Sequence, residues 1–141
     1  MRHSHLFAIA AITAWAGSVG IAQRVNSLQE LTLGMKTIGA SVAAADQAIS
    51  SAAHPDAKAQ LVLARQMLAS TVPFWLQRKT DEAAKMTRDA ISKLDALDKV
   101  LSPATVDSAA ATAALKQVTA TCAACHTAYR EGDQQTGYRI K

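Results

Sequence analysis

Apolar residues recur along this chain at alternating spacings of three and four, with polar residues between them. Because an α-helix has about 3.6 residues per turn, this spacing gathers the apolar side chains on one face of a helix. Four stretches carry the pattern, over residues 27–50, 56–72, 80–101 and 105–131. In the first stretch the apolar positions are Leu28, Leu31, Met35, Ile38, Val42, Ala45 and Ile49. The pattern therefore predicts four amphipathic helices.

Prolines and a capping box mark the ends of the first two predicted helices. Ser27 and Glu30 form an S-x-x-E capping box at the start of the first. Pro55 separates the two helices, because the residue before a proline avoids the helical conformation. Pro73 is expected to end the second helix. The link 73–79 carries the only Phe and Trp that follow residue 22, and we expect them to seal one end of the core.

Similar signals bound the other two helices and set the predicted fold. Thr80 can cap the third helix, and Ser102-Pro103 stops it. Gly132 is expected to end the fourth helix, and the polar tail from there to Lys141 is expected to be loose. Short links make successive helices antiparallel. The predicted fold is therefore all-α, an antiparallel up-and-down four-helix bundle.

The first 22 residues have the features of a secretory signal peptide. Arg2 supplies a positive start, residues 6–16 are an apolar run interrupted only by Thr13, and small residues lead up to Ala22. The run is shorter than the roughly 20 apolar residues that span a bilayer. An uncleaved anchor and a cut after Ala16 are the alternatives. We expect residues 23–141 to be one soluble domain, exported to the periplasm, with no membrane span after cleavage.

Charge and composition narrow the function classes. Only 4% of the 141 residues are aromatic and alanine is abundant, which favours helices. The chain has 15 basic and 11 acidic residues, so loss of Arg2 with the signal peptide leaves a net charge of +3. Basic residues form no long run, and we therefore expect no nucleic-acid partner. No catalytic triad, paired carboxylates or phosphate loop is evident, and we expect no enzyme activity.

The chain's two cysteines stand three residues apart and are followed at once by a histidine. Cys122, Cys125 and His126 fall within one turn of the fourth predicted helix, on the same face as Leu115 and Val118. The three side chains should therefore project together into the bundle. A zinc site, a redox dithiol, a disulfide and a covalent haem all use such groups.

Three of these alternatives leave something unexplained. A structural zinc site needs four ligands, and the only other histidine after residue 22 is His54, in a predicted loop. A thioredoxin-type dithiol needs a cysteine at a helix N-terminus, but this pair lies late in its helix. A Cys122–Cys125 disulfide would make a haem-free exported helical protein. Such a disulfide would stabilise the fold little, because the loop that it closes is very short. It would also leave His126 without a role.

The order C-x-x-C-H is the attachment motif of c-type haem. Two thiols add across the two vinyl groups of haem, and the adjacent histidine binds the iron. The motif thus predicts one covalent haem c, attached through Cys122 and Cys125, with His126 as the proximal iron ligand. Export fits this prediction, because the thioether bonds form after export.

Residues 122–130, CAACHTAYR, close the last helix of a four-helix exported chain and resemble the haem motif of class II c-type cytochromes. This family comprises cytochrome c-prime and its low-spin relatives. Residues 35–42, MKTIGASV, resemble the family's first helix. The resemblance implies a periplasmic monohaem cytochrome that carries single electrons between redox partner proteins. It also implies Met35 as the distal iron ligand, whereas Met67 and Met86 are expected in the core.

The family also supplies an alternative function and further expectations. Members without a distal methionine have five-coordinate iron and bind NO or CO, so a gas-binding cytochrome c-prime is the alternative. Arg130 matches the family's Tyr-Arg pair and is expected at the haem or a haem propionate; the alternative is a solvated basic residue. Tyr129 should pack beside the haem. Many members carry an Arg at the propionates, where this chain has Gln29, Glu30 and Leu31. A homodimer is implied by the resemblance alone.

Overall fold

The computed structural model describes residues 24–133 and 135–141. The helices of this part are α1 (Leu28–Ser50), α2 (His54–Gln77), α3 (Asp81–Val100) and α4 (Ser108–Tyr129). Two short strands follow, β1 (Arg130–Glu131) and β2 (Arg139–Ile140). The predicted signal peptide, residues 1–22, lies outside the described residues. No helix in the described part of the chain is both long and apolar enough to cross a membrane.

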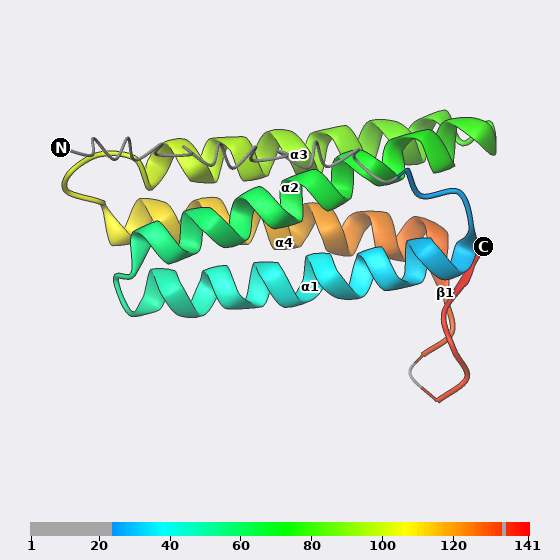
Figure 1. Cartoon of the computed structure of the whole chain (residues 1–141), viewed down its shortest axis with the longest axis horizontal. Coiled ribbons are helices and arrows are strands. Elements are labelled where there is room, and N and C mark those ends of the chain that lie inside the picture. Colours follow the sequence, from blue (N-terminus) through cyan, green and yellow to red (C-terminus); the bar gives the residue numbers. More distant parts are fainter. Residues whose placement is uncertain (1–23, 134) are drawn as a thin grey trace, which may run out of the picture.

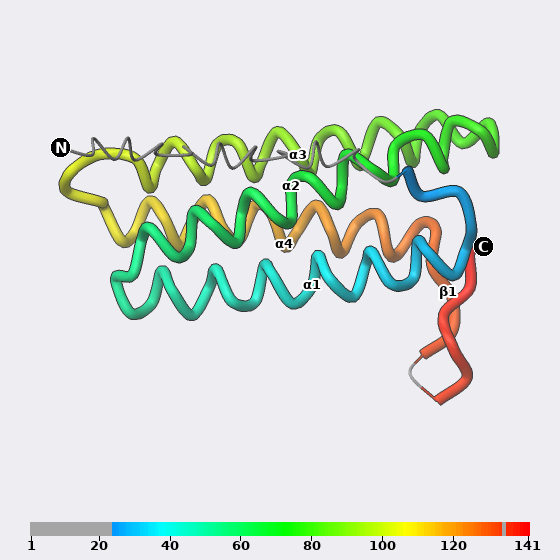
Figure 2. The backbone as a smooth tube through the Cα atoms, in the orientation of Figure 1, coloured from blue at the N-terminus to red at the C-terminus, as the bar shows by residue number. Residues whose placement is uncertain are grey.

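Successive helices lie side by side and run in opposite directions (Figure 1). The prediction of an all-α chain with four antiparallel helices is confirmed. Close contacts join α1 to α2, α2 to α3 and α3 to α4, whereas α1 and α4 meet only sparsely. The tube in Figure 2 shows the first and last helices as the two elements nearest the C-terminal hairpin. The bundle is therefore least tightly packed between the two helices that carry the predicted haem ligands.

The start of α1 follows the predicted capping box. Ser27 Oγ accepts a hydrogen bond from the Glu30 N–H at 3.1 Å, and the Glu30 carboxylate accepts from the N–H groups of Ser27 and Asn26 at 3.1 and 2.7 Å. The backbone donors Asn26 and Ser27 hold the pKa of Glu30 below its ordinary value. These bonds satisfy donors that have no partner within the helix, so α1 begins at Leu28.

The prediction that Pro73 ends the second helix is wrong. The helix α2 starts at His54 and continues through Pro73 to Gln77. Phe74 and Trp75 are 1% and 3% exposed, and their rings pack edge to face with centroids 5.1 Å apart. Burial of two large rings stabilises the last turn enough to offset the hydrogen bond that a proline removes. The expectation that they seal one end of the core is confirmed.

The ends of α3 and α4 also differ from the predicted ones. Thr80 precedes α3, but its hydroxyl donates to the Arg78 carbonyl at 3.4 Å and caps no helical N–H group. The fourth helix starts at Ser108, because the Asp107 carboxylate accepts from the N–H groups of Ala109 and Ala110 at 2.9 and 3.0 Å. It ends at Tyr129, two residues earlier than predicted.

The tail that follows α4 is ordered as a hairpin, so the expectation of a loose tail is wrong for its described residues. In the two strands Arg130 pairs with Ile140, and Glu131 pairs with Arg139. Gly132 has a φ of +83°, and a side chain there would collide with the Gly137 carbonyl. This turn brings residues 138–141, which we call the strap, back to the end of α4 (Figure 1).

Apolar side chains form two clusters. The larger one runs along the bundle and includes Ile38, Leu61, Leu68, Leu94, Leu97, Leu115 and Val118. The second, which we call the end cluster, consists of Val25, Leu31, Phe74, Trp75, Ala83 and Ala84. Tyr129 and Ile140 pack against the end cluster, and Met35 packs against both clusters. The strap is thus held to the bundle by an apolar contact.

Candidate functional site

The two thiols and the imidazole of the C-x-x-C-H motif lie near the end of α4, as predicted. Cys122, Cys125 and His126 are all half-buried, and both cysteines are free thiols. His54 starts α2 at the opposite end of the bundle from the end of α4, and the structure does not bring it to the motif (Figure 1). Among the described residues, no three His, Cys, Asp or Glu side chains are grouped so that they could hold a metal ion.

Burial determines how these groups ionise. It raises the pKa of the Cys122 thiol, and it raises the pKa of Cys125 with a further contribution from the neighbouring Cys122. Burial lowers the pKa of His126, and the positive charge of Arg130 lowers it further. The thiols are therefore protonated at neutral pH, unlike the reactive cysteine of a redox dithiol. The imidazole is neutral and keeps a nitrogen lone pair for a metal.

A cavity of about 470 Å³, which we call the central cavity, lies beside these groups within the bundle. Its volume is within the usual range for small-molecule sites. Gly39 lies in its wall, and a side chain there would meet no neighbouring atom within 4 Å. The wall is mostly apolar and comes from all four helices, including Met35, Ile38, Gly39, Leu68, Met86, Leu115, Cys122, Cys125 and His126.

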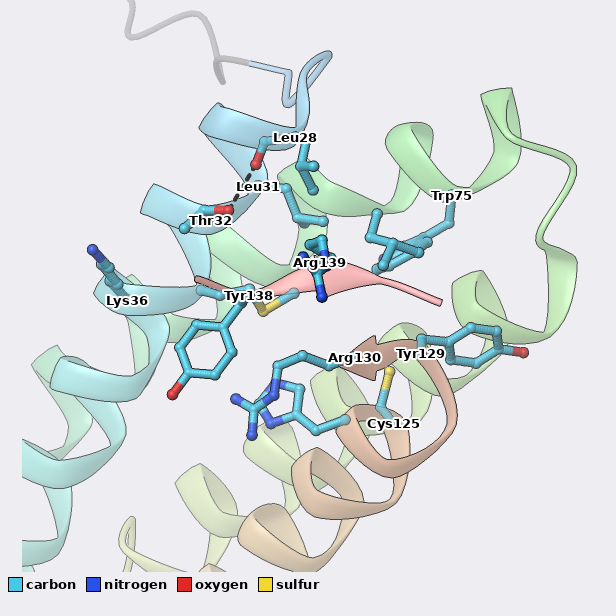
Figure 3. Close-up of a pocket in the computed structure, with 13 residues that line it drawn as sticks. Leu28, Leu31, Thr32, Lys36, Trp75, Cys125, Tyr129, Arg130, Tyr138 and Arg139 are labelled. Carbon is cyan, nitrogen blue, oxygen red and sulfur yellow. Dashed lines mark hydrogen bonds between the residues drawn. The ribbon is translucent and has the colours of Figure 1, made fainter. Parts of the chain in front are cut away.

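A second cavity of about 190 Å³, which we call the end cavity, lies between the bundle and the strap (Figure 3). In Figure 3, Leu31 from α1 and Trp75 from α2 both reach toward β2. The wall also includes Met35, Lys36, Cys125, His126, Tyr129, Arg130, Tyr138, Arg139 and Ile140. Met35, Cys125 and His126 line both cavities. The predicted proximal and distal iron ligands therefore both lie in the walls of the two cavities.

Of the three methionines with a predicted role, only Met86 lies in a different environment from the one predicted. Met35, on α1, is half-buried and faces both cavities, as a ligand from the first helix should. Met67 packs against the larger cluster, as predicted for a core residue. Met86 was also expected in the core, but it is half-buried in the wall of the central cavity. It therefore provides a natural comparison for Met35.

Tyr129 and Arg130 both reach the end cavity. Tyr129 is half-buried, and its ring centroid lies 6.0 Å from that of Trp75. Arg130 is exposed, and it lies in β1 instead of in the last turn of the helix where it was predicted. Its guanidinium carbon lies 4.5 Å from the ring centroid of Tyr138, where cation and ring attract each other. Arg130 thus joins α4 to the strap.

The strap was missed in the sequence, and Trp75 was assigned only a packing role. Tyr138, Arg139 and Ile140 alternate between the two sides of a strand, and Gly132 and Gly137 bracket the turn before them. Two glycines that flank a polar turn are a recognised hairpin signal. With only two residues in each strand, that signal was too short to outweigh the polar composition of the tail.

The chain matches no protein-family model, no curated protein and no solved structure.

Proposed function

We propose that this protein is a class II c-type cytochrome that carries single electrons, with one haem c attached through Cys122 and Cys125. The observation that carries the proposal is the shared wall of the two cavities. Met35 from α1 and Cys125 and His126 from α4 line both cavities, beside enough space for a cofactor. This is the grouping that the C-x-x-C-H motif and the family resemblance call for.

The chemistry of the cavities supports a haem in particular. The central cavity is mostly apolar, which suits a large flat ring. Both thiols are free and lie at its edge, and His126 is favoured in the neutral form that binds iron. The end cavity is lined by Lys36, Arg130 and Arg139 and by no acid, which suits the two carboxylates of a haem.

Each residue then has a definite task. Haem iron supplies the one-electron redox chemistry when it is bound. Cys122 and Cys125 tether the cofactor through thioether bonds, and His126 presents a neutral imidazole nitrogen. Met35 presents its thioether from α1, and a sulfur ligand of this kind raises the reduction potential. The apolar side chains of the two cavities exclude water.

The test is a haem-stained denaturing gel of the chain exported to the periplasm of a host that attaches haem c. The expected result is a stained band at the size of the mature chain. The band should be absent in the variant Cys122→Ser/Cys125→Ser and present in a control variant such as Lys116→Gln. An unstained wild-type band would refute the proposal and favour the alternative of a haem-free protein with a Cys122–Cys125 disulfide.

A five-coordinate cytochrome c-prime that binds NO or CO is the second candidate. The space on either side of Met35 is the observation that favours it. A high-spin spectrum that changes on addition of CO would support this candidate, and a low-spin spectrum would support electron transfer. The proposed partners are redox proteins. The homodimer implied by the family stays a prediction, which sedimentation equilibrium can test.

A further inference from the structure

One buried donor, on a residue that lines the end cavity, lacks a partner. Trp75 is 3% exposed, yet its indole N–H group has no hydrogen-bond acceptor among the described residues. Buried polar groups in proteins are nearly always hydrogen-bonded, so an orphan of this kind needs an explanation. Trp75 also lines the end cavity. A ligand with an acceptor oxygen in that cavity would satisfy it.

The charges around the same cavity are of one sign. Lys36, Arg130 and Arg139 line it, and no aspartate or glutamate does. Arg139 lies 3.4 Å from Glu131, but both side chains are largely exposed, so the pair is weak and can rearrange. Lys36 forms no ion pair within the part of the chain that the structure describes. The cavity therefore favours an anion.

The rest of the wall is apolar or aromatic. Leu31, Trp75 and Ile140 belong to the end cluster or pack against it, so a small hydrated ion would lose water there without replacement. The fitting ligand has an apolar body and a carboxylate at its edge. Cys125 and His126 stand in the same wall, so the end cavity adjoins the proposed haem site.

We infer that the end cavity binds the carboxylate edge of the haem, with Trp75 as hydrogen-bond donor and Arg139 and Lys36 as cations. The inference rests on the proposed function. Haem carries its two carboxylates away from the vinyl groups that join the cysteines. Trp75 and Arg139 come from α2 and the strap, so these two elements position the cofactor edge without contributing an iron ligand.

The first test is Trp75→Phe in the haem-loaded full chain, which keeps an aromatic ring and removes the N–H group. The resonance Raman band of the haem carboxylates should shift, because the band reports on their hydrogen bonds. Lys116→Gln, on the exposed side of α4, is the control and should leave the band in place. An unshifted band in Trp75→Phe would overturn the role of Trp75.

The second test uses charge and does not depend on the tryptophan variant folding. Ferric haem carries one more positive charge than ferrous haem, so loss of a nearby cation lowers the midpoint potential. Arg139→Gln and Lys36→Gln should each lower it, Arg139→Lys should restore it, and Lys116→Gln should not change it. Potentials equal to that of Lys116→Gln in both neutral variants would overturn the inference.

A free anion such as phosphate could occupy the end cavity in place of a haem carboxylate. If the haem carboxylates fill the cavity, added inorganic phosphate should not change the potential of the wild-type protein at constant ionic strength. A phosphate-dependent shift that disappears in Arg139→Gln would overturn the inference in favour of a separate anion site. Absence of haem from the wild type would refute the proposed function itself, whereas these outcomes in a haem-loaded protein would overturn this inference alone.

Discussion

The side chains of Cys122 and Cys125 show what burial does to a reactive pair. A redox dithiol works through a thiolate with a lowered pKa, whereas burial raises the pKa of both thiols here. The raised pKa values keep both thiols protonated at neutral pH, and a protonated thiol is a poor nucleophile. The position late in a helix, away from the positive end of the dipole, predicted the same direction from the sequence, whereas the cause in the structure is burial.

The reactivity of the thiols can be measured in chain that carries no haem. Because the pKa of each thiol lies above its ordinary value of 9.0, the thiolate fraction below that pH is smaller than in an unfolded chain. Alkylation by iodoacetamide at pH 8 should therefore be slower in the folded chain than in urea, and its rate should still be rising with pH where that of the unfolded chain levels off. Faster alkylation of the folded chain would show a lowered pKa and support a redox dithiol instead.

Met35 and Met86 offer a matched pair of methionines, since both line the central cavity but only Met35 also faces the end cavity. In the haem-loaded protein, Met35→Ala should convert a low-spin visible spectrum to a high-spin one, because the sixth ligand is lost. Met86→Ala should leave the spectrum low-spin. An unchanged spectrum in Met35→Ala would rule out Met35 as the distal ligand.

At the scale of elements, the apolar period predicted four helices correctly but misplaced several ends. Ends depend on single hydrogen bonds and on tertiary burial, which a period of three and four does not reveal. Pro73 stays within α2 because Phe74 and Trp75 are buried beyond it. The helix α4 begins after Asp107, which caps it, although Thr105 is also a residue type that can cap a helix.

The start of α4 gives a direct test of this view. Asp107→Ala removes the acceptor of two backbone N–H groups and should lower the free energy of unfolding by about 1 kcal/mol. Thr105→Ala, two residues before it, should have almost no effect. Urea denaturation of both variants measures the difference. Equal stabilities, or a larger loss for Thr105→Ala, would place the start of the helix at the residue predicted from sequence.

The strap is the element that sequence reasoning missed, and its anchoring is local. The Lys141 N–H donates to the Tyr129 carbonyl at 3.1 Å, the Lys141 ammonium donates to the Thr127 carbonyl at 2.6 Å, and Ile140 packs on the end cluster. Ile140→Ser should therefore lower the free energy of unfolding by about 1 kcal/mol, because a half-buried apolar side chain is lost. Ile140→Val is the control. Identical urea midpoints for the two variants would show that the strap does not pack on the bundle in solution.

At the scale of the whole molecule, three of the four pairs of neighbouring helices pack closely, and the fourth pair, α1 and α4, packs loosely. Contacts run from α1 to α2, α3 and α4 in order, and the sparse contact between α1 and α4 leaves space where Met35 faces the motif. The up-and-down order and the inward face of the motif followed from the sequence. The strap and the orphan N–H of Trp75 did not, because they depend on contacts between distant segments.

The mass of the intact exported chain under denaturing conditions shows directly whether a haem is attached to it. We expect the mass of the mature chain plus one haem, and the added mass should be absent in Cys122→Ser/Cys125→Ser. A mass equal to the mature chain, or lower by the two hydrogens lost on forming a disulfide, would contradict it.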